Sequence, residues 1–395
     1  MALSAATTVG HYQIVGSRKR NDHFMRRAYV GAAAMILVGS VATLSAQEPL
    51  IPAGCPEVSV QESPVHTREP VTAERTASDI LVAEGQAATR TMSSETVAKA
   101  ISLYEQAVRA DPTNARAFML LARMNTQSQR FLSVPKKLAR ARAWENLSKG
   151  RALDPLNVDG LHLLADQLMA DRGAYKCAKT ILEAALKLDP SNARSNYYYS
   201  QLLSGMGEFD LAFEYADKAL AVAGDADTHN FVMTNAGRPR YMARQYEWVL
   251  TKYLVSTPDA PLAHFYRSLA FGAKGMFTKA LDEAKAYQAG DRGRDAGGVG
   301  MIALAYANAG QKDKAREVLS DLLQRDARGE HVVEYRIAAV YEALGERDEA
   351  LRWLERDIDD RDGLGSWLVW LNHDPVWDAA RKDPRFREIQ RRAGW

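Results

Sequence analysis

Cysteine is scarce in this chain of 395 residues, which contains only Cys55 and Cys177. A fold held together by several disulfides is therefore excluded, and so is a zinc site built from two cysteine pairs. The two thiols pair after export, or Cys177, which lies among small packing residues, stays buried and free. The sequence leaves both alternatives open.

An excess of either charge is also missing, because 51 basic side chains face 49 acidic ones. The first 27 residues hold five of the basic and one of the acidic side chains, so the remainder is slightly acidic. Proteins that bind nucleic acids present clustered Lys and Arg side chains to the phosphates. We therefore expect no nucleic-acid partner.

Catalytic and metal-binding motifs are absent from the sequence. The eight histidines are scattered without the spacing of metal ligands, and the chain has neither a nucleophile elbow nor a phosphate-binding loop. Acidic pairs fall where helical surfaces and turns would expose them to water. We expect a protein that is not an enzyme and that carries no metal and no other cofactor.

A long uncharged and largely apolar run extends from Ala28 to Leu44, directly after Arg26 and Arg27. The small residues that follow it complete the layout of a signal peptide. We expect residues 1–46 to be a signal peptide, with the true start possible at Met25, and the rest of the chain to be periplasmic or secreted. The alternative is an uncleaved inner-membrane anchor that leaves the chain facing the periplasm, because basic residues precede the run.

Residues 47–75 contain five prolines and no aromatic side chain, which indicates a flexible linker. After this linker, apolar residues recur at helical spacing, with turn signals every dozen or so residues. The organised part of the chain is therefore expected to be all-α.

Five short stretches repeat the pattern of a glycine, four residues and an alanine. They are GAYKCA, GEFDLA, GMFTKA, GQKDKA and GERDEA, which begin at Gly173, Gly207, Gly275, Gly310 and Gly345. Their spacing is about 34 residues except for one double interval, so a degenerate copy is expected around Tyr246. Repetition at this period is typical of a solenoid.

Two further columns follow the same period. A small residue stands seven or eight positions before each glycine, as at Ala165 and Ser200, and a proline follows twelve residues after the helical alanine, as at Pro190. Small residues allow two helices to approach closely, glycine permits the turn between them, and proline ends the second helix. These columns predict a repeated helix-turn-helix unit.

This unit resembles the tetratricopeptide repeat, and the resemblance covers roughly residues 76–361. It implies an α-α superhelix of seven or eight units over residues 76–367. The segment 368–395 resembles the tails of repeat arrays in bacterial regulators and receptor-like kinases, and its last helix is expected to cap the array.

The sequence departs from the repeat pattern in three places. Nine extra residues lie near RFLSVPKK, a poorly matching copy surrounds Gly237, and the stretch AGDRGRDAGG begins at Ala289. Each is either a binding feature or a tolerated loop.

In this family the first helix of each unit lines a groove that receives peptides or helices of partner proteins. Aromatic and Met side chains in such a column suit partner binding, although several of them alternatively pack against the neighbouring unit. Among three consecutive tyrosines, Tyr197 is expected to face the groove. The expected groove residues are Arg116, Met119, Arg123, Asp159, His162, Asp166, Tyr197, Gln201, Phe231, Asn235, Phe265 and Tyr335.

The resemblance therefore implies a protein-protein interaction scaffold in the periplasm or cell envelope. Its partners are proteins, and it touches a membrane only through an uncleaved N-terminal segment. The alternative function is that of a membrane-anchored sensor or regulator whose effector domain is absent from this chain.

Overall fold

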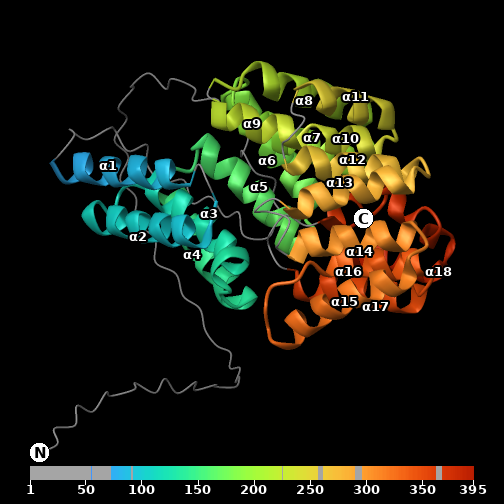
Figure 1. Cartoon of the computed structure of the whole chain (residues 1–395). Coiled ribbons are helices and arrows are strands. Elements are labelled where there is room, and N and C mark those ends of the chain that lie inside the picture. Colours follow the sequence, from blue (N-terminus) through green and yellow to red (C-terminus); the bar gives the residue numbers. More distant parts are fainter. Residues whose placement is uncertain are drawn as a thin grey trace, which may run out of the picture. The chain divides into compact units, whose positions relative to one another are not determined.

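The structure is a computed structural model that describes Cys55 and residues 73–89, 92–224, 226–256, 261–289, 296–361 and 367–395. The expected signal peptide and almost all of the expected linker lie outside the described residues. Within the described part every regular element is helical, as the apolar spacing predicts (Figure 1). No helix there is both long and apolar enough to cross a membrane.

Antiparallel helix pairs follow one another along the chain. The first four pairs are α1 (Ala73–Ala88) with α2 (Ser94–Ala110), α3 (Ala115–Leu132) with α4 (Lys136–Leu153), α5 (Val158–Arg172) with α6 (Tyr175–Leu188), and α7 (Ala193–Met206) with α8 (Phe209–Ala221). The next are α9 (Ala226–Asn235) and α10 (Gly237–Met242) with α11 (Tyr246–Ser256), α12 (Pro261–Ala273) with α13 (Phe277–Ala289), α14 (Ala296–Asn308) with α15 (Lys312–Ala327), and α16 (Glu334–Leu344) with α17 (Arg347–Asp360). The chain is therefore an α-α solenoid.

The turns between pairs follow from a short Asp-Pro-x-Asn motif. In each of its three copies the proline ends one helix, and the asparagine two residues later caps the next helix. The side-chain oxygens of Asn114, Asn157 and Asn192 accept hydrogen bonds from backbone N–H groups in the first turns of α3, α5 and α7. The motif therefore fixes where the first helix of each of these pairs begins.

The turns within pairs confirm the glycine and small-residue columns. All five predicted glycines have positive φ, between 58° at Gly173 and 85° at Gly345. The small residues are buried where the two helices of a pair touch, and where serine replaces alanine its hydroxyl reaches the facing helix. Ser200 Oγ donates to the carbonyl of Ala212 at 2.7 Å, and Ser268 Oγ donates to that of Ala280 at 2.8 Å.

The irregular copy has a first helix that is broken into α9 and α10, next to Gly237. Its inner turn is made by Arg244, whose φ is 62°, instead of a glycine. The backbone N–H of Gln245, the residue after Arg244, donates to the carbonyl of Arg240, five residues earlier. In the next unit the N–H of Met276, the residue after Gly275, donates in the same way to the carbonyl of Phe271, so Arg244 corresponds to Gly275. The degenerate copy is therefore centred three residues later than predicted, and Val249 rather than Tyr246 fills the alanine position.

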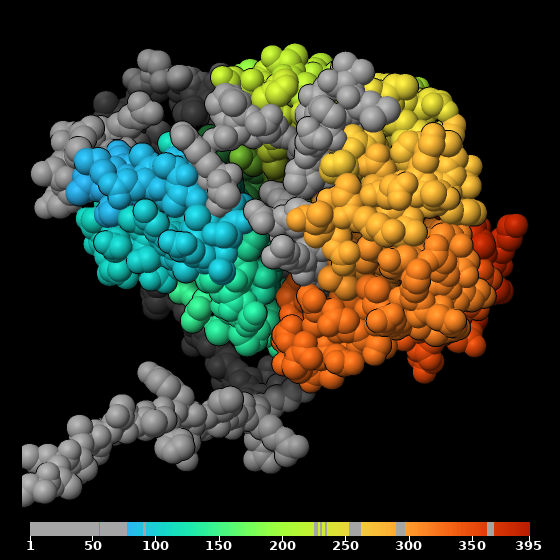
Figure 2. Space-filling view, in the orientation of Figure 1, coloured from blue at the N-terminus to red at the C-terminus, as the bar shows by residue number. Residues whose placement is uncertain are grey.

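The nine extra residues lengthen α3 and α4 rather than forming a loop. Only Ser133, Val134 and Pro135 separate the two helices. The far end of this hairpin contacts the last unit, because Lys136 ion-pairs with Glu334 at the start of α16 and Arg140 Nη1 donates to the carbonyl of Arg361 at 2.7 Å. In Figure 2 the green surface of α4 meets the orange surface of the last units. The stretch AGDRGRDAGG lies mostly outside the described residues.

The C-terminal segment consists of η2 (Trp367–Trp370), η3 (Pro375–Trp377), η4 (Ala380–Lys382) and α18 (Pro384–Ala393), together called the tail. Helix α18 packs against α17, as expected for a cap. The rest of the tail also packs against first helices of earlier units, because η2 contacts α5 and α7 while η3 contacts α16. The last residue, Trp395, stacks on Tyr175 at the start of α6 with ring centroids 4.2 Å apart.

The described core has two main parts. A large cluster of buried side chains extends from Met119 to Ala393 and includes the tail. A separate, smaller cluster lies between α1, α2 and α3, around Tyr104 and Met124. The first unit therefore has a core of its own, whereas the later units share one with the tail.

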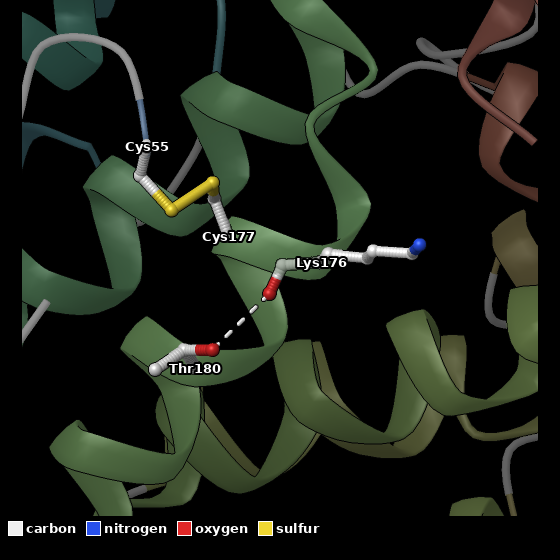
Figure 3. Close-up of a disulfide and its surroundings, with 4 residues drawn as sticks. All are labelled: Cys55, Lys176, Cys177 and Thr180. Atoms are coloured by element: carbon white, nitrogen blue, oxygen red, sulfur yellow. Dashed lines mark hydrogen bonds between the residues drawn. A yellow bond between two sulfur atoms is a disulfide. The ribbon is translucent and has the colours of Figure 1, made fainter. Parts of the chain in front are cut away.

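Cys55 and Cys177 form a disulfide, which decides the alternative that the sequence leaves open (Figure 3). Cys177 lies in the first turn of α6, next to Lys176, whose carbonyl accepts a hydrogen bond from Thr180 Oγ1 at 3.3 Å. The bond joins residues 122 positions apart. It attaches the segment before α1 to the third unit of the solenoid.

Candidate functional site

The first helices of neighbouring units lie side by side, since α3 contacts α5, α5 contacts α7, and α14 contacts both α12 and α16. Together they form what we call the inner surface of the solenoid. Arg116, Asp159 and Arg194 are the second residues of α3, α5 and α7. Their side chains therefore lie at corresponding positions along this surface.

A cavity of about 600 Å³ opens in the inner surface beside α1, α3, α5 and α7. We call it the open cavity. Five expected groove residues line it, namely Arg116, Met119, Arg123, Asp159 and His162. Apolar side chains add to the lining, among them Leu120, Leu163 and Val222. The open cavity thus combines charged and apolar walls.

His162 is 2% exposed, and its ring stacks on that of Tyr198 with centroids 5.4 Å apart. Its Nδ1 lies 3.8 Å from Asp159 Oδ1, which is too far for a hydrogen bond. Burial lowers the pKa of His162 from 6.5 to about 4, and the negative charge of Asp159 opposes this effect. At neutral pH the imidazole is therefore uncharged.

Asp166 follows His162 by one turn of α5. Burial raises the pKa of its carboxyl to about 7, and the nearby charge of Asp171 raises it as well. Arg238, a hydrogen bond with Tyr198 and Arg123 act in the opposite direction. The charge of Asp166 is therefore influenced both by Arg123, which lines the open cavity, and by Arg238, which contacts the tail.

The tail covers another part of the inner surface. The indole Nε1 of Trp370 donates to Ser204 Oγ at 2.9 Å, and the guanidinium of Arg238 lies 4.3 Å from the Trp370 ring. Trp367 packs against the guanidinium of Arg336 at 4.0 Å. These contacts occupy the surface that the first helices of the later units would otherwise present to a partner.

Four expected groove residues belong to this covered part. The backbone carbonyl of Gln201 accepts from Trp370 Nε1 at 3.2 Å, and Tyr335 donates its hydroxyl hydrogen to Asp374 at 2.9 Å. Phe265 lies 5.8 Å from Trp367, and Asn235 Oδ1 accepts from Arg238 Nη2 at 3.3 Å. The structure therefore divides the expected groove between the open cavity and the tail.

The tyrosine run differs from the expectation. Tyr197 is only 6% exposed and packs edge-on against Phe231, in a small cluster with Ala219 and Val232. It is Tyr198 that lies over His162. Consecutive helical residues point about 100° apart, so a small error in the assumed rotation of α7 exchanges the two roles.

Sequence reasoning missed Arg194, which lines the open cavity from α7. The signal was present, because DPTNAR ending at Arg116 recurs as DPSNAR ending at Arg194. It also missed the tail tryptophans as occupants of the inner surface. Their sequence carries no repeat pattern that would place them there.

The site has the properties of a binding surface. No cluster of His, Cys, Asp and Glu suited to a metal ion occurs in the described ranges. The titratable groups of the open cavity are a neutral histidine, a tyrosine, arginines and aspartates, set beside apolar side chains. Such a surface can hold the side chains of a polypeptide by charge and apolar contact.

Comparison with known proteins agrees with the repeat architecture. The family model of the tetratricopeptide repeat matches residues 87–156, which include α2, α3 and α4. The human IFIT1 dimer with PPP-AAAA is similar in structure, with a TM-score of 0.50, 17% identity, and coverage of 71% of this chain and 72% of that chain. No curated protein matches the chain.

Two other structures are similar at lower scores. The APC/C hetero-tetramer Cut9–Hcn1 has a TM-score of 0.48 and 13% identity, and yeast Tom70 has 0.45 and 17%. The match covers 82% of this chain and 57% of the Cut9–Hcn1 chain, so this chain spans little more than half of that relative. For Tom70 the coverage is 84% of this chain and 69% of that chain.

Most of the helix pairs repeat at about the same interval, five of them turn at a glycine of positive φ, and three begin after an Asp-Pro-x-Asn motif. The family model matches within this array. The described helix pairs have the architecture of tetratricopeptide repeats, and residues 87–156 match the family model of that repeat.

Proposed function

We propose that this protein is a non-enzymatic scaffold of the cell envelope, which binds a segment of a partner protein in the open cavity. The observation that supports this function is the division of the inner surface. The tail fills the part around Trp370, whereas the cavity of about 600 Å³ stays accessible beside α1, α3, α5 and α7. A cavity of this volume admits several side chains of a polypeptide.

This division reduces the number of expected groove residues that a partner could contact. Those that line the open cavity remain candidates for partner binding, namely Arg116, Met119, Arg123, Asp159 and His162. The residues that contact the tail or Arg238 serve the solenoid itself. A partner would therefore be bound by the first units of the array and not along its whole length.

Incorporation of a photo-crosslinking amino acid at Leu120, which lines the open cavity, tests this function in cells. We expect one or a few envelope proteins to be captured from this position. The matched control is Phe277, which is 40% exposed at the start of α13. Identical capture patterns from both positions, or no capture at Leu120, would contradict the proposal.

The disulfide supports the export of the chain, because disulfides persist in oxidising compartments such as the periplasm. We propose that the segment 1–46 is removed and that the solenoid acts in the periplasm. The alternative function, a membrane-anchored regulator, would keep this segment in the inner membrane. Sequencing of the mature N-terminus distinguishes the cleaved scaffold from the anchored regulator. A first residue at Gln47 supports cleavage and release into the periplasm, and an intact segment in the membrane fraction supports the anchored regulator.

A further inference from the structure

The first two units, α1 to α4, share little buried apolar surface with the rest of the solenoid. We call these units the arm, which is blue to blue-green in Figure 1, and the described part from α5 to the tail the body. Among the described residues of the arm, only Met119, Ala122 and Leu147 are buried members of the large apolar cluster. The first unit has a cluster of its own around Tyr104. The apolar contact between the arm and the body is therefore small.

Polar side chains lie where α3 and α4 of the arm meet α5 of the body. Thr126 Oγ1 donates to Gln167 Oε1 at 3.4 Å, and Trp144 Nε1 donates to Asp171 Oδ2 at 2.5 Å. Gln167 Nε2 also donates to Asp171 Oδ2, at 2.5 Å. We call these four residues the seam. A polar contact between two parts of a chain favours relative movement, because its groups can bond to water when the contact opens.

Met119 is the main apolar contact of α3 with the body. Its side chain lies against Gly150 of α4 and Gly160 of α5, where an added Cβ atom would come within 2.9 and 2.5 Å of it. An unbranched thioether adapts to a changed angle between helices more readily than a branched side chain does. The two glycines carry no side chain that would block such a change. Met119 therefore provides a pivot about which α3 can turn relative to α5.

The far end of the α3–α4 hairpin is held by charged contacts with the last unit, which we call the clasp. Lys136 ion-pairs with Glu334, whose side chain is 1% exposed. Arg140 Nη1 donates to the carbonyl of Arg361 at 2.7 Å. The nine extra residues of the hairpin give it the length to reach these partners. Along both α3 and α4 the seam lies between the pivot and the clasp.

The open cavity lies near the beginning of α3, at the other end from the clasp. The arm supplies one wall of this cavity, with Ala83 and Arg116, and the body supplies the opposite wall, with Asn192 and Val222. Because α3 is a single helix, a turn about the pivot that moves its far end away from α5 also moves its beginning. The width of the open cavity therefore depends on whether the clasp is formed.

We propose that the arm opens from the body along the seam by turning about Met119, and that the clasp between α4 and the last unit holds the arm closed. Release of the clasp changes the width of the open cavity and so regulates what can enter it. The opening of the arm does not depend on the proposed function. Its effect on the access of a partner rests on that function.

A thiol placed in the seam measures the opening. In Thr126→Cys the thiol replaces a side chain that is 9% exposed, and it becomes available to N-ethylmaleimide when the seam opens. The native cysteines are paired and do not react. The matched control is Ser268→Cys, at a position 3% exposed inside the pair of α12 and α13, whose thiol reacts only when the later units unfold.

Mass spectrometry follows both reactions in the full-length protein. Each rate is divided by that of the same variant unfolded in urea, which removes differences in intrinsic reactivity between the two thiols. We expect the normalised rate of Thr126→Cys to exceed that of Ser268→Cys by about tenfold or more, because the seam opens without unfolding of the body.

Lys136→Glu places a second carboxylate beside Glu334 and should release the clasp. It should raise the normalised rate of Thr126→Cys by about tenfold, which corresponds to about 1.4 kcal/mol, and leave that of Ser268→Cys unchanged. The charge of Glu334 helps to raise the pKa of Arg356, so a cation remains near this carboxylate in the variant. The milder Lys136→Gln should act in the same direction.

Lys149→Glu is the matched control on the same helix, because it also replaces the cation of an ion pair, here the exposed pair with Glu145. It should leave both normalised rates unchanged.

Spin labels on Glu84→Cys and His229→Cys measure the width of the open cavity. Both positions are exposed, on α1 and α9, next to residues that line the cavity. Electron paramagnetic resonance should give a shifted distance distribution between the labels in Lys136→Glu and the native distribution in Lys149→Glu.

Equal normalised rates of Thr126→Cys and Ser268→Cys would overturn the proposal, because the seam would then open only when the body unfolds. So would a rate of Thr126→Cys that Lys136→Glu raises no more than Lys149→Glu does, or a distance distribution that Lys136→Glu leaves unchanged. If the rates and distances are as expected while crosslinking at Leu120 captures nothing, the arm is supported and the proposed function fails. If Leu120 captures a partner while the two rates are equal, the proposed function stands and the arm is refuted.

Discussion

Gly205, on α7, lies directly against the backbone of the tail. A Cβ atom at this position would lie 2.4 Å from the carbonyl oxygen of Val369 and 2.9 Å from its Cγ2. The oxygen belongs to the backbone of η2, so it cannot swing away as a side chain would. Gly205→Ala should therefore push η2 off α7.

The expected loss of stability in Gly205→Ala is the difference between two opposing effects. Alanine in place of glycine inside a helix stabilises it by about 1 kcal/mol. Insertion of a methyl group into a packed contact costs about 1 to 3 kcal/mol, and a clash at 2.4 Å with backbone belongs to the upper part of that range. We expect a net loss of about 1 to 2 kcal/mol in the free energy of unfolding.

Gly272→Ala is the matched control on α12. The nearest atoms to its added Cβ lie at 3.8 and 3.9 Å, which is ordinary contact, so this variant should be stabilised by up to about 1 kcal/mol. Equilibrium unfolding in urea, followed by tryptophan fluorescence and circular dichroism, measures both. If Gly205→Ala is stabilised as much as Gly272→Ala, the tail does not pack on α7 as described.

Three further predictions concern stability. Burial lowers the pKa of His162 from its ordinary value of 6.5 to about 4, so the contribution of the neutral imidazole to stability is complete above pH 6.5 and is lost as the pH falls toward 4. In urea unfolding, the free energy of unfolding of His162→Gln should therefore fall less over this pH range than that of the native protein, by at most about 3 kcal/mol. Identical pH profiles of the two proteins would disprove this prediction. Cys177→Ser should cost about 2 to 5 kcal/mol, and dithiothreitol should lower the melting temperature of the native protein but not of the variant. Lys136→Met removes one partner of the buried carboxylate of Glu334 and should lower the free energy of unfolding in urea by about 1 to 3 kcal/mol. Lys149→Met, at an exposed pair, should change it by less than about 0.5 kcal/mol, and equal effects would argue against the contact between α4 and α16.

The helix pairs could be predicted from sequence because their causes are local. The positive φ of Gly173 and the close helix contact at Ala165 each require a residue type at one position, and the repeat multiplies the signal. The displaced turn at Arg244 shows the limit of this reasoning. A non-glycine residue can adopt the same backbone when its side chain gains partners, here Asp378 of the tail at 2.6 Å.

The covering of the inner surface could not be predicted in this way. Trp370 and Ser204 are 166 residues apart, and Lys136 and Glu334 are 198 apart. No periodic pattern connects such positions. The prediction that Arg116, Arg123 and Asp159 lie on one common surface needed only the helix register, whereas their separation from Phe265 and Tyr335 depends on where the tail folds.

The tail also fixes how many units the array can have. Its residues are bonded at one end to Ser204 of α7 and at the other to Tyr335 of α16, through Trp370 and Asp374. A repeat added or removed between these helices would move one attachment point away from the other. Evolution can lengthen most solenoids by duplication, but in this protein only the first unit, α1 with α2, lies outside these attachments, because α4 also contacts the last unit through Lys136 and Arg140. That first unit forms part of the wall of the open cavity.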